Sequence, residues 1–439
     1  MTTARSPRIS PALFAHAEAA LEAVLRLDYP ADAVVSRYFR EHRELGHRDR
    51  GFVAEVVFAV LRRKRSLEYL ARPSGAPRLL LLAALACIQG ANLRELQGLA
   101  AEEDLEWLAA AKGEWAAMHK GAATEGAASE VPPAVRRDLP DWLHERLLAQ
   151  MGEAELDALV TAINQSAPLD LRINPVKANR EAVQARLAAD GIVAAPTPYS
   201  PLGLRLKDKP ALSRHPLFLD GSIEVQDEGS QLLGLLVAPK RGEMVADFCA
   251  GAGGKTLLLG ALMRSQGRLY AFDVSEKRLA NLKPRLARSG LSNVHPVRIE
   301  HEADTKVKRL AGKMDRVLVD APCSGLGTLR RNPDLKWRQD EASVAELVQK
   351  QTSILAAAAR LVRPGGRLVY ATCSLLREEN DGVADAFLAA HPEFVAVSAA
   401  TVLEKQDVVV PGVGERLALQ PQHHGSDAFF AAVFERKAP

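Results

Sequence analysis

The chain has 439 residues, of which 47% are hydrophobic and 25% are charged, and its formal net charge is +3. This balance is typical of two or three globular domains and excludes a disordered or fibrous protein. Its four cysteines, Cys87, Cys249, Cys323 and Cys373, form no CxxC pair and no Cys/His spacing typical of zinc. We therefore expect no disulfide framework, no bound metal and a reducing compartment.

Neither secretion nor membrane insertion is expected. The apolar residues of the first 25 positions are interrupted by His16, Glu18 and Glu22, which does not suit a signal peptide. The longest apolar run, residues 79–88, is about half as long as a membrane span. We expect a cytoplasmic protein without membrane contact, whose small positive charge permits a polyanionic partner without requiring one.

The pattern of apolar residues changes along the chain. Residues 1–115 have helical periodicity and predict an all-α domain, and the small polar residues of 116–133 predict a linker. Residues 134–220 predict helices followed by a small α/β module. From 221 to 439, strands alternate with helices, which is typical of a doubly wound parallel sheet. The apolar run at 426–437 predicts a seventh strand, antiparallel and at the sheet edge.

A glycine-rich loop, ADFCAGAGGKT at 246–256, joins the first of these strands to its helix. Glycine permits a sharp bend and a close approach to a ligand, and the amides of the next helix favour negative groups. The pattern is not GxGxxG, and a phosphate loop would need glycine where Cys249 stands. It is close to the D-x-G-x-G-x-G loop of S-adenosylmethionine (SAM) methyltransferases. The predicted cofactor-binding residues in it are Cys249, Ala250, Gly251, Ala252, Gly253, Gly254 and Lys255.

Aspartates follow successive strands of the predicted sheet. Asp273 closes the second strand, where a carboxylate can accept hydrogen bonds from both ribose hydroxyls of an adenosyl group. Asp304 follows the third strand, where it can face the adenine, and Asp320 ends the fourth. A single aspartate at a strand end is more often a helix cap. Four of them, counting Asp247, at the edge where open sheets bind ligands predict a nucleoside cofactor, SAM.

Two cysteines stand where strands end, in VLVDAPCSG at 317–325 and RLVYATCS at 367–374. The first corner resembles the Pro-Cys corner that base methyltransferases place against a flipped base. Carbon 5 of a pyrimidine is too weak a nucleophile to take a methyl group from a sulfonium, but a thiolate that adds at C6 activates it. Nitrogen methylation needs no such thiol, so the pair predicts C5 chemistry. The residues leave open whether Cys323 or Cys373 attacks.

Three blocks carry a family resemblance: DFCAGAGGKT, DAPCSGLGTLRRNPDLKWR and YATCS-x-x-x-EEN. They are similar to the signature blocks of the RNA 5-methylcytosine methyltransferases of the RsmB/NOP2/Sun (Fmu) family, and the likeness extends over 135–437, including LRIN and IEVQDEGSQL. The resemblance implies a class I methyltransferase with a Rossmann-like seven-stranded sheet. It also implies a small α/β RNA-recognition-like module and, more faintly, a NusB-like helical domain at the N-terminus.

The resemblance also implies roles for single residues. It makes Cys373 the nucleophile and Cys323 the group that assists product release. It places Lys255 at the cofactor and Asp320 between the methyl group and the amino edge of cytosine. The family's loop usually has the sequence CAAPGGKT, and the Gly251-Ala252 pair of this chain, which replaces Ala-Pro, indicates a divergent subgroup.

Basic segments predict where RNA lies. LRRNPDLKWR at 329–338 combines positive charge with Trp337, which suits a phosphate backbone and a stacked base, although a packed Trp in a solvated loop is the alternative. LRRKRS at 61–66 is expected to be a solvated helix face, or an RNA contact if the domain is NusB-like. The insert at 166–215 is expected to contact RNA through its shape and through phosphates.

Together these observations predict a monomeric, SAM-dependent methyltransferase that acts on C5 of a cytosine in RNA, with 16S rRNA as the predicted substrate, through a covalent bond between cysteine and C6. A tRNA cytosine-C5 methyltransferase is the nearest alternative. A catalytically silent RNA-binding ribosome assembly factor is a second, disfavoured by the intact Cys323, Cys373 and Asp320. An NAD-dependent oxidoreductase is a third, disfavoured by the thiols and the loop pattern.

Overall fold

The computed structural model describes residues 9–119 and 131–438. The chain forms two compact units: a helical unit, Met1–Gln165 with Leu329–Asp340, and a sheet unit, Ser166–Thr328 with Glu341–Pro439. The four-part division of the chain that the sequence suggests stays a prediction. Most of the predicted linker at 116–133 lies outside the described residues.

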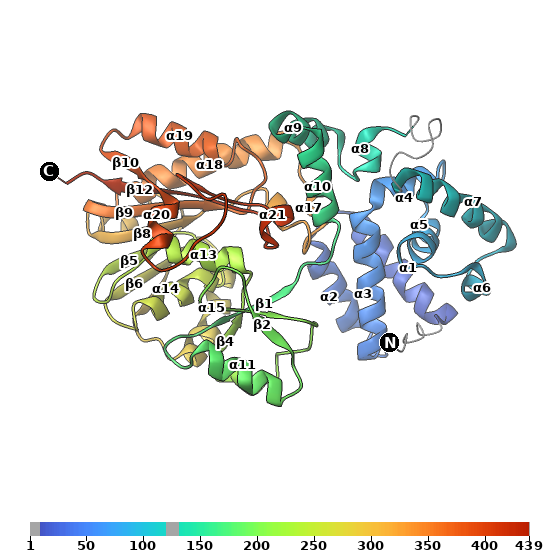
Figure 1. Ribbon diagram of the computed structural model, residues 1–439, viewed down its shortest axis with the longest axis horizontal. Coiled ribbons are helices and arrows are strands. Elements are labelled where there is room, and N and C mark those ends of the chain that lie inside the picture. The colour runs from blue at the N-terminus through green and yellow to red at the C-terminus, as the bar shows by residue number, and fades with distance from the viewer. Residues whose placement is uncertain (1–8, 120–130, 439) are drawn as a thin grey trace. The chain divides into compact units, whose positions relative to one another are not determined.

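The helical unit is an all-α bundle, and its N-terminal helices are drawn in blue and cyan in Figure 1. Its first helix begins where the Ser10 hydroxyl accepts a hydrogen bond from the amide of Leu13 and a proline takes the first helical position. Leu21, Val57 and Leu81 are fully buried and belong to one core of this unit. The helices are α1 (Pro11–Leu25), α2 (Ala31–Glu41), α3 (His47–Arg62), α4 (Lys64–Leu70), α5 (Pro77–Ala83), the π-helix η1 (Ala84–Ile88), α6 (Leu93–Leu96), α7 (Glu102–His119), α8 (Pro133–Arg136), α9 (Asp141–Met151), α10 (Glu153–Ile163) and α17 (Leu335–Arg338).

The segment Leu329–Asp340 packs inside the helical unit, although it follows the Cys323 corner in sequence. Lys336 is 1% exposed, and its ammonium group donates a hydrogen bond to the backbone oxygen of Arg62 at 2.9 Å. The Trp337 indole donates to the backbone oxygen of Leu61 at 2.8 Å. The prediction that this segment offers its cations to RNA is therefore wrong for the buried Lys336, whereas contact of the half-buried Trp337 with RNA stays a prediction.

The basic cluster at 61–66 is not a solvated helix face. The guanidinium of Arg65 forms ion pairs and hydrogen bonds with Asp141, and that of Arg63 lies 3.3 Å from Asp138. Asp138 is fully buried and also accepts hydrogen bonds from the backbone and the hydroxyl of Ser66. Much of the cluster's charge is therefore used to stabilise the helical unit, and its contact with RNA stays a prediction.

Burial of Lys336 makes the folding stability depend on pH, since desolvation lowers the pKa of its ammonium group to about 7. Between about pH 7 and 10 the unfolded chain holds a proton that the folded chain has lost, so folding stability rises with pH. We expect the stability of the wild type relative to Lys336→Met to rise over this range by up to about 1.4 kcal/mol per pH unit. Urea unfolding at several pH values measures it, and a difference independent of pH would contradict it.

The sheet unit begins with a small α/β module. Its four strands are all antiparallel, in the order β2-β3-β1-β4. Leu171, Ile173, Val183 and Leu187 are buried between this sheet and its helix. The elements are β1 (Leu169–Ile173), α11 (Arg180–Ala189), β2 (Ala194–Pro196), β3 (Gly203–Leu206), α12 (Pro216–Leu219) and β4 (Ile223–Val225).

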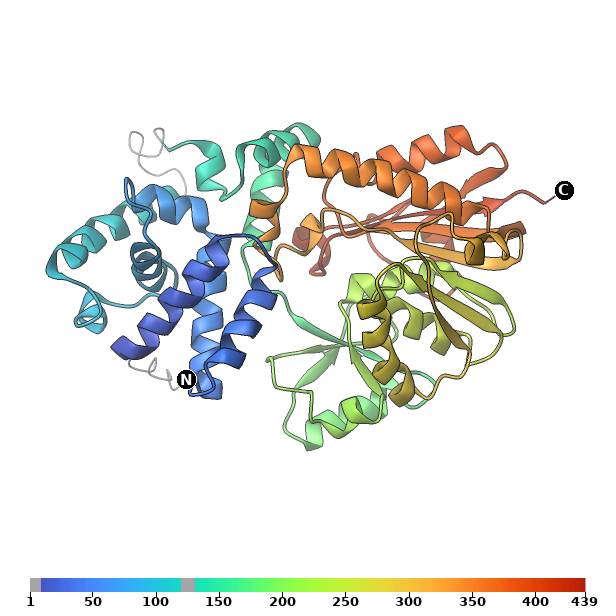
Figure 2. The ribbon, with the colours of Figure 1, turned by 180° about the vertical axis from the view of Figure 1, so that it is seen from behind.

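A larger sheet follows, in the order β10-β12-β9-β8-β5-β6-β7, with β11 added beside β12. Its five strands β5 to β9 are parallel. Figures 1 and 2 show α18 and α19 on one face, and α13 and α14 on the other. The elements are α13 (Glu228–Val237), β5 (Met244–Asp247), α14 (Gly254–Leu262), β6 (Arg268–Asp273), α15 (Glu276–Ser289), β7 (Val294–Arg298), α16 (Thr305–Lys308), β8 (Met314–Asp320), η2 (Leu326–Thr328), α18 (Glu341–Ala359), β9 (Val362–Thr372), α19 (Asp381–Ala390), β10 (Phe394–Val397), α20 (Ala399–Glu404), β11 (Leu417–Leu419), α21 (Pro421–His424) and β12 (Phe429–Arg436).

The last strand is antiparallel, as predicted, but it does not lie at the sheet edge. β12 pairs with β9 on one side and with β10 on the other. Residues 429–434 are all buried, and strands covered on both faces have continuous apolar runs of this kind. The continuous run FFAAVF therefore indicated an interior strand, and the prediction of an edge position was wrong.

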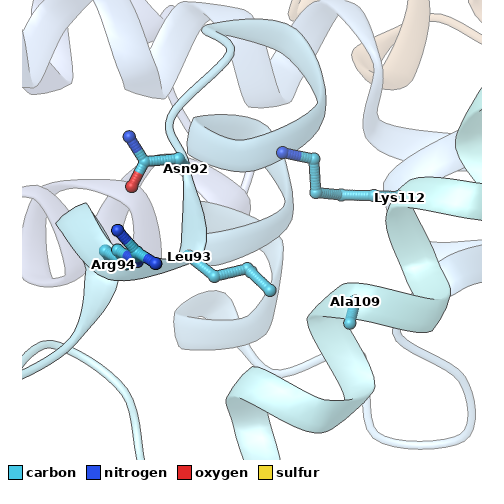
Figure 3. A pocket seen from close by; sticks show the side chains of 5 residues that line it. All are labelled: Asn92, Leu93, Arg94, Ala109 and Lys112. Carbon is cyan, nitrogen blue, oxygen red and sulfur yellow. The ribbon is translucent and has the colours of Figure 1, made fainter.

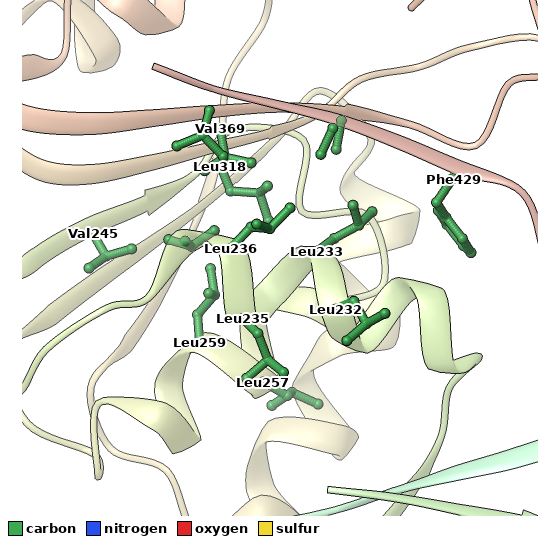
Figure 4. Close-up of a cluster of buried hydrophobic side chains, with 14 of the residues drawn as sticks. Leu232, Leu233, Leu235, Leu236, Val245, Leu257, Leu259, Leu318, Val369 and Phe429 are labelled. Carbon is green, nitrogen blue, oxygen red and sulfur yellow. The ribbon is translucent and has the colours of Figure 1, made fainter. Parts of the chain in front are cut away.

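The core of this sheet lies in two layers, one on each face. On one face, Leu236 of α13 points toward Leu318 of β8 and Val369 of β9 (Figure 4). On the other face, Leu355 of α18 belongs to the same cluster as Val317 of β8. Both faces are therefore covered mainly by apolar side chains. Within the described residues, no helix has the length and apolar character needed to cross a membrane.

Candidate active site

The candidate site lies at the carboxyl ends of the parallel strands. β5 ends at Asp247, β6 at Asp273, β8 at Asp320 and β9 at Thr372. Parallel strands bring these ends to one edge, and the register pairs Asp320 with Ala371, so the turns after β8 and β9 start side by side. The glycine loop and both strand-end thiols emerge from this edge, as the sequence predicts.

The glycine loop turns at Gly253, whose φ is +84°. A Cβ atom there would lie 2.1 Å from Leu282, so the position needs both the conformational freedom and the small size of glycine. The amide of Gly251 donates a hydrogen bond to the Asp273 carboxylate at 2.8 Å. A Cβ atom at Gly251 would meet nothing within 4 Å, so the loop faces open space beside Asp273.

Two arginines hold the carbonyls of this loop, and the sequence analysis did not identify them. Arg285 of α15 donates to the backbone oxygen of Ala252, and Arg172 of β1 donates to that of Gly254, both at 2.6 Å. Arg172 is 2% exposed, and desolvation lowers its pKa to about 10. The signal was present in LRIN, where a charged residue interrupts an apolar strand.

The buried Asp247 lies under the loop. Its Oδ2 atom accepts a hydrogen bond from the Thr256 hydroxyl at 2.7 Å, whereas Oδ1 has no protein partner. Desolvation raises the pKa of this carboxyl to about 7, and the Asp320 charge acts in the same direction. An unpartnered polar atom at the floor of a ligand loop leaves hydrogen-bonding capacity for a bound group.

An ion pair joins the loop to β8. The Lys255 ammonium donates to Asp320 Oδ2 at 2.7 Å, and both side chains are only partly exposed. Burial lowers the pKa of Lys255, but the charge and the hydrogen bond of Asp320 outweigh this effect and leave it raised. Lys255 therefore stays charged at the cofactor loop, which places a fixed positive charge beside the Asp320 carboxylate.

The two strand-end thiols meet. The sulfurs of Cys323 and Cys373 lie 3.5 Å apart, and both residues are partly accessible. The hydrogen bond to Cys373, together with burial, raises the pKa of the Cys323 thiol well above its usual range. Cys323 therefore keeps its proton, and either sulfur can be the donor in the contact between the two thiols.

Asp304 and the other two cysteines have surroundings different from those of the thiol pair. Asp304 caps α16 and accepts hydrogen bonds from the amides of Lys306 and Glu300, so its role at an adenine stays a prediction. Burial and three nearby carboxylates raise the pKa of Cys249 well above the usual range, which makes it a poor nucleophile. Burial also raises the pKa of Cys87, to about 11, and this side chain packs against the helical core.

Two features of the helical unit were not predicted. A hollow of about 600 Å³ lies at α6 and α7 and is lined by Asn92, Leu93, Arg94, Ala109 and Lys112 (Figure 3); the lining offers no thiol or carboxylate. His16, His42 and Glu44 bring three potential metal-ligand atoms within 4.8 Å of one another. These three are separated in sequence by up to 28 positions, so their spacing gave no metal signal. The expectation that the protein binds no metal stays a prediction.

Comparisons with known proteins agree with this geometry. A family model described as 16S rRNA methyltransferase RsmB/F matches residues 234–435, and a ferredoxin-like domain of RsmF/B-like methyltransferases matches residues 139–213. A protein from Synechocystis sp., named probable ribosomal RNA small subunit methyltransferase B, is 34% identical over 95% of this chain and 97% of its own length. The chain belongs to the RsmB/NOP2/Sun family.

Two solved structures have a fold similar to that of this chain. The crystal structure of PH0851 has a TM-score of 0.77 and 25% identity, and covers 98% of this chain and 99% of that chain. NSun6 from Pyrococcus horikoshii, solved with SFG, has a TM-score of 0.60 and 20% identity, and covers 68% of this chain and 99% of that chain. The class I methyltransferase fold and its ferredoxin-like module are thus confirmed, and a NusB-like fold for the helical domain stays a prediction.

As a member of the RsmB/NOP2/Sun family, the protein is a SAM-dependent RNA methyltransferase. The residues at the loop suit this cofactor. The space beside Gly251 and the unpartnered Oδ1 of Asp247 offer room and hydrogen-bonding capacity, and contact of Asp273 with ribose hydroxyls stays a prediction. Because the loop turns tightly at Gly253, its backbone can lie directly beside a bound cofactor.

The raised pKa of Asp247 makes the folding stability depend on pH. Between about pH 4 and 7 the folded chain holds a proton on Asp247 that the unfolded chain has lost, so stability falls as pH rises. Relative to Asp247→Asn, the wild type should lose up to about 1.4 kcal/mol per pH unit across this range and then level off. Denaturant unfolding without cofactor measures the difference.

Asp304 supplies the matched control. Hydrogen bonds from the amides of Lys306 and Glu300 lower its pKa, so its contribution to stability is present above about pH 4 and is lost below it. Asp304→Asn should therefore change the pH dependence in the opposite direction. A flat difference for Asp247→Asn would show that its carboxyl titrates normally.

Proposed function

We propose that this protein methylates C5 of a cytosine in 16S rRNA through a covalent bond between Cys373 and C6. The observation that carries the proposal is the pair of sulfurs 3.5 Å apart beside the ion pair of Lys255 and Asp320. Only C5 chemistry needs a thiol nucleophile, and a second thiol has a use only if the first must later leave.

In the first stage Cys373 attacks. Its thiolate forms a bond to C6, and the electron pair of the C5–C6 double bond becomes available at C5. SAM supplies an electrophilic methyl group on a sulfonium. C5 bonds to that methyl group as the bond from methyl to sulfur breaks, so the negative thiolate and the positive sulfonium together give neutral products. The ion pair of Lys255 and Asp320 keeps the cofactor loop at a fixed position relative to the edge of the cytosine base.

In the second stage the product leaves. A base takes the proton from C5, the C5–C6 double bond reforms, and the bond between C6 and the Cys373 sulfur breaks. Cys323, which keeps its proton in the resting site, gives that proton to the departing sulfur across 3.5 Å. Proton transfer between the two thiols then restores the starting state. The resemblance to the RsmB/NOP2/Sun family favours Cys373 as the nucleophile, a choice that the residues alone left open.

The substrate assignment rests on relatives. The Synechocystis relative is named a ribosomal RNA small subunit methyltransferase, and it covers nearly the whole chain, which favours 16S rRNA over tRNA. An assembly factor without catalysis would have no need of the paired thiols. Bisulfite mapping of 16S rRNA from a strain that lacks the gene should reveal one cytosine that is no longer protected.

The two thiols should behave differently when replaced. Cys373→Ala should abolish methyl transfer, because no thiolate can activate C5. Cys323→Ala should allow methyl transfer but slow release, so that a protein–RNA adduct survives a denaturing gel. Transfer of labelled methyl groups and gel mobility measure the two steps.

Cys87→Ala is the matched control, since this thiol is packed in the helical core. It should neither stop transfer nor trap RNA. Methylation by Cys373→Ala, or an adduct that forms with Cys373→Ala but not with Cys323→Ala, would exchange the roles of the two thiols and refute the assignment.

The cofactor assignment has its own test. Labelled SAM should bind and NAD should not, because the loop lacks the dinucleotide pattern. Asp273→Asn should weaken SAM binding about 10- to 100-fold, as expected for the loss of a charged acceptor of ribose hydroxyls. Equal binding of NAD, or unchanged SAM affinity in Asp273→Asn, would contradict this assignment.

A further inference from the structure

Each thiol is followed in sequence by a serine, and both serines bind one carboxylate. Ser324, next to Cys323, donates from its backbone amide to Glu379 Oε1 at 2.8 Å and from its hydroxyl to Oε2 at 2.5 Å. Ser374, next to Cys373, donates from its hydroxyl to the same Oε2 atom. Glu379 thus connects the two corners that present the thiols.

The carboxylate lies in the interior. Glu379 is 0% exposed, as is Gln351, whose side-chain amide donates to Glu379 Oε1 at 2.9 Å. A carboxylate has only acceptors to offer, and burying it is costly unless donors surround it. Two donors reach each of its oxygens, and all four come from the protein. Removing the carboxylate would leave the Ser324 amide and the Gln351 amide without that acceptor.

A second contact limits how the corners can move. The amide of Gly327 donates to the backbone oxygen of Cys373 at 2.8 Å. A Cβ atom at Gly327 would lie 2.7 Å from that oxygen and 2.4 Å from the backbone oxygen of Ala428. The corner after Cys323 therefore approaches the corner after Cys373 as closely as backbone permits, and Glu379 acts on the side where the serines lie.

We propose that Glu379 is a positioning residue that holds the Cys323 and Cys373 sulfurs within reach of each other. It touches neither thiol directly and acts through Ser324 and Ser374. The effect on methyl transfer rests on the proposed function, whereas the spacing of the sulfurs can be measured without RNA or cofactor. If the proposed reaction is wrong, methyl transfer is not observed, but the spacing of the sulfurs can still be measured. The two failures can therefore be distinguished.

The first experiment uses oxidation of the full-length protein by diamide. Diamide takes two electrons and two protons from a neighbouring thiol pair, and a Cys323–Cys373 disulfide forms. Mass spectrometry of peptides measures its rate. The rate should be high in the wild type, where the sulfurs lie 3.5 Å apart, and at least about tenfold lower in Glu379→Ala, because disulfide bonding needs close and correctly oriented sulfurs.

The direction of this change separates position from charge. The negative charge of Glu379 helps to raise the pKa of the Cys323 thiol. Loss of the charge alone would make Cys323 easier to ionise and would speed oxidation. Slower oxidation in Glu379→Ala therefore reports a wider or misaligned pair, whereas an equal or faster rate would overturn the proposal.

The second experiment measures methyl transfer. Glu379→Ala should lower kcat about 100-fold, as a misplacement of about 1 Å can, and leave the KM for RNA and the affinity for SAM nearly unchanged. A general loss of folding would reduce the active fraction without this split, and a melting curve monitors it. If kcat is unchanged while KM rises, Glu379 binds substrate instead, and the proposal is wrong.

Two further variants keep the test decisive. If Glu379→Ala does not fold, Ser374→Ala removes a single hydroxyl from the network and should slow oxidation and kcat in the same direction by a smaller factor. Glu243→Gln is the control: this half-buried glutamate pairs with Arg316 at the amino end of β5, and its replacement should alter neither readout. Wild-type oxidation rates in Ser374→Ala would refute the proposal. Slow oxidation in the Glu379 variant, with no cytosine methylation by any form, would refute only the proposed reaction.

Discussion

The site depends on the parallel register of two neighbouring strands. β8 and β9 pair so that Asp320 lies beside Ala371, and Cys323 and Cys373 follow these residues by three and two positions. Parallel pairing makes both chains leave the sheet at the same edge, and similar short turns bring the sulfurs together. In an antiparallel pair the two turns would lie at opposite ends. Two thiols separated by 50 positions therefore become one chemical unit because of sheet topology.

That edge also carries buried charged groups. Both faces of the sheet are covered by apolar side chains, so charged groups at the strand ends must find partners among themselves. Lys255 pairs with Asp320, and Glu379 receives four donors. Asp247 has a donor at only one of its two oxygens. Asp247 is the last residue of β5, directly before the glycine loop, and it is 1% exposed.

Sequence patterns predicted most of this site because its parts are local. The glycine loop, the aspartates at strand ends and the thiol corners are each defined within about ten residues, and the alternation of strands and helices places them at one edge. What the sequence missed depends on distant partners. Arg172 supports the loop across 82 positions, and Trp337 packs against residues more than 270 positions away. The FFAAVF run of β12 is continuously apolar, as is typical of an interior strand, whereas the prediction placed this strand at the sheet edge.

The two thiols have the same chemistry, so the different roles that we propose for them must come from their surroundings. Cys323 is in a hydrogen bond to Cys373 and close enough to Glu379 to feel its charge, and both effects keep the proton on Cys323. A pair that shared its protons equally would offer two poor nucleophiles and no reliable acid. In the proposed reaction, one carboxylate that touches neither sulfur would act twice: through Ser324 and Ser374 it would position the two corners, and its charge raises the pKa of the Cys323 thiol.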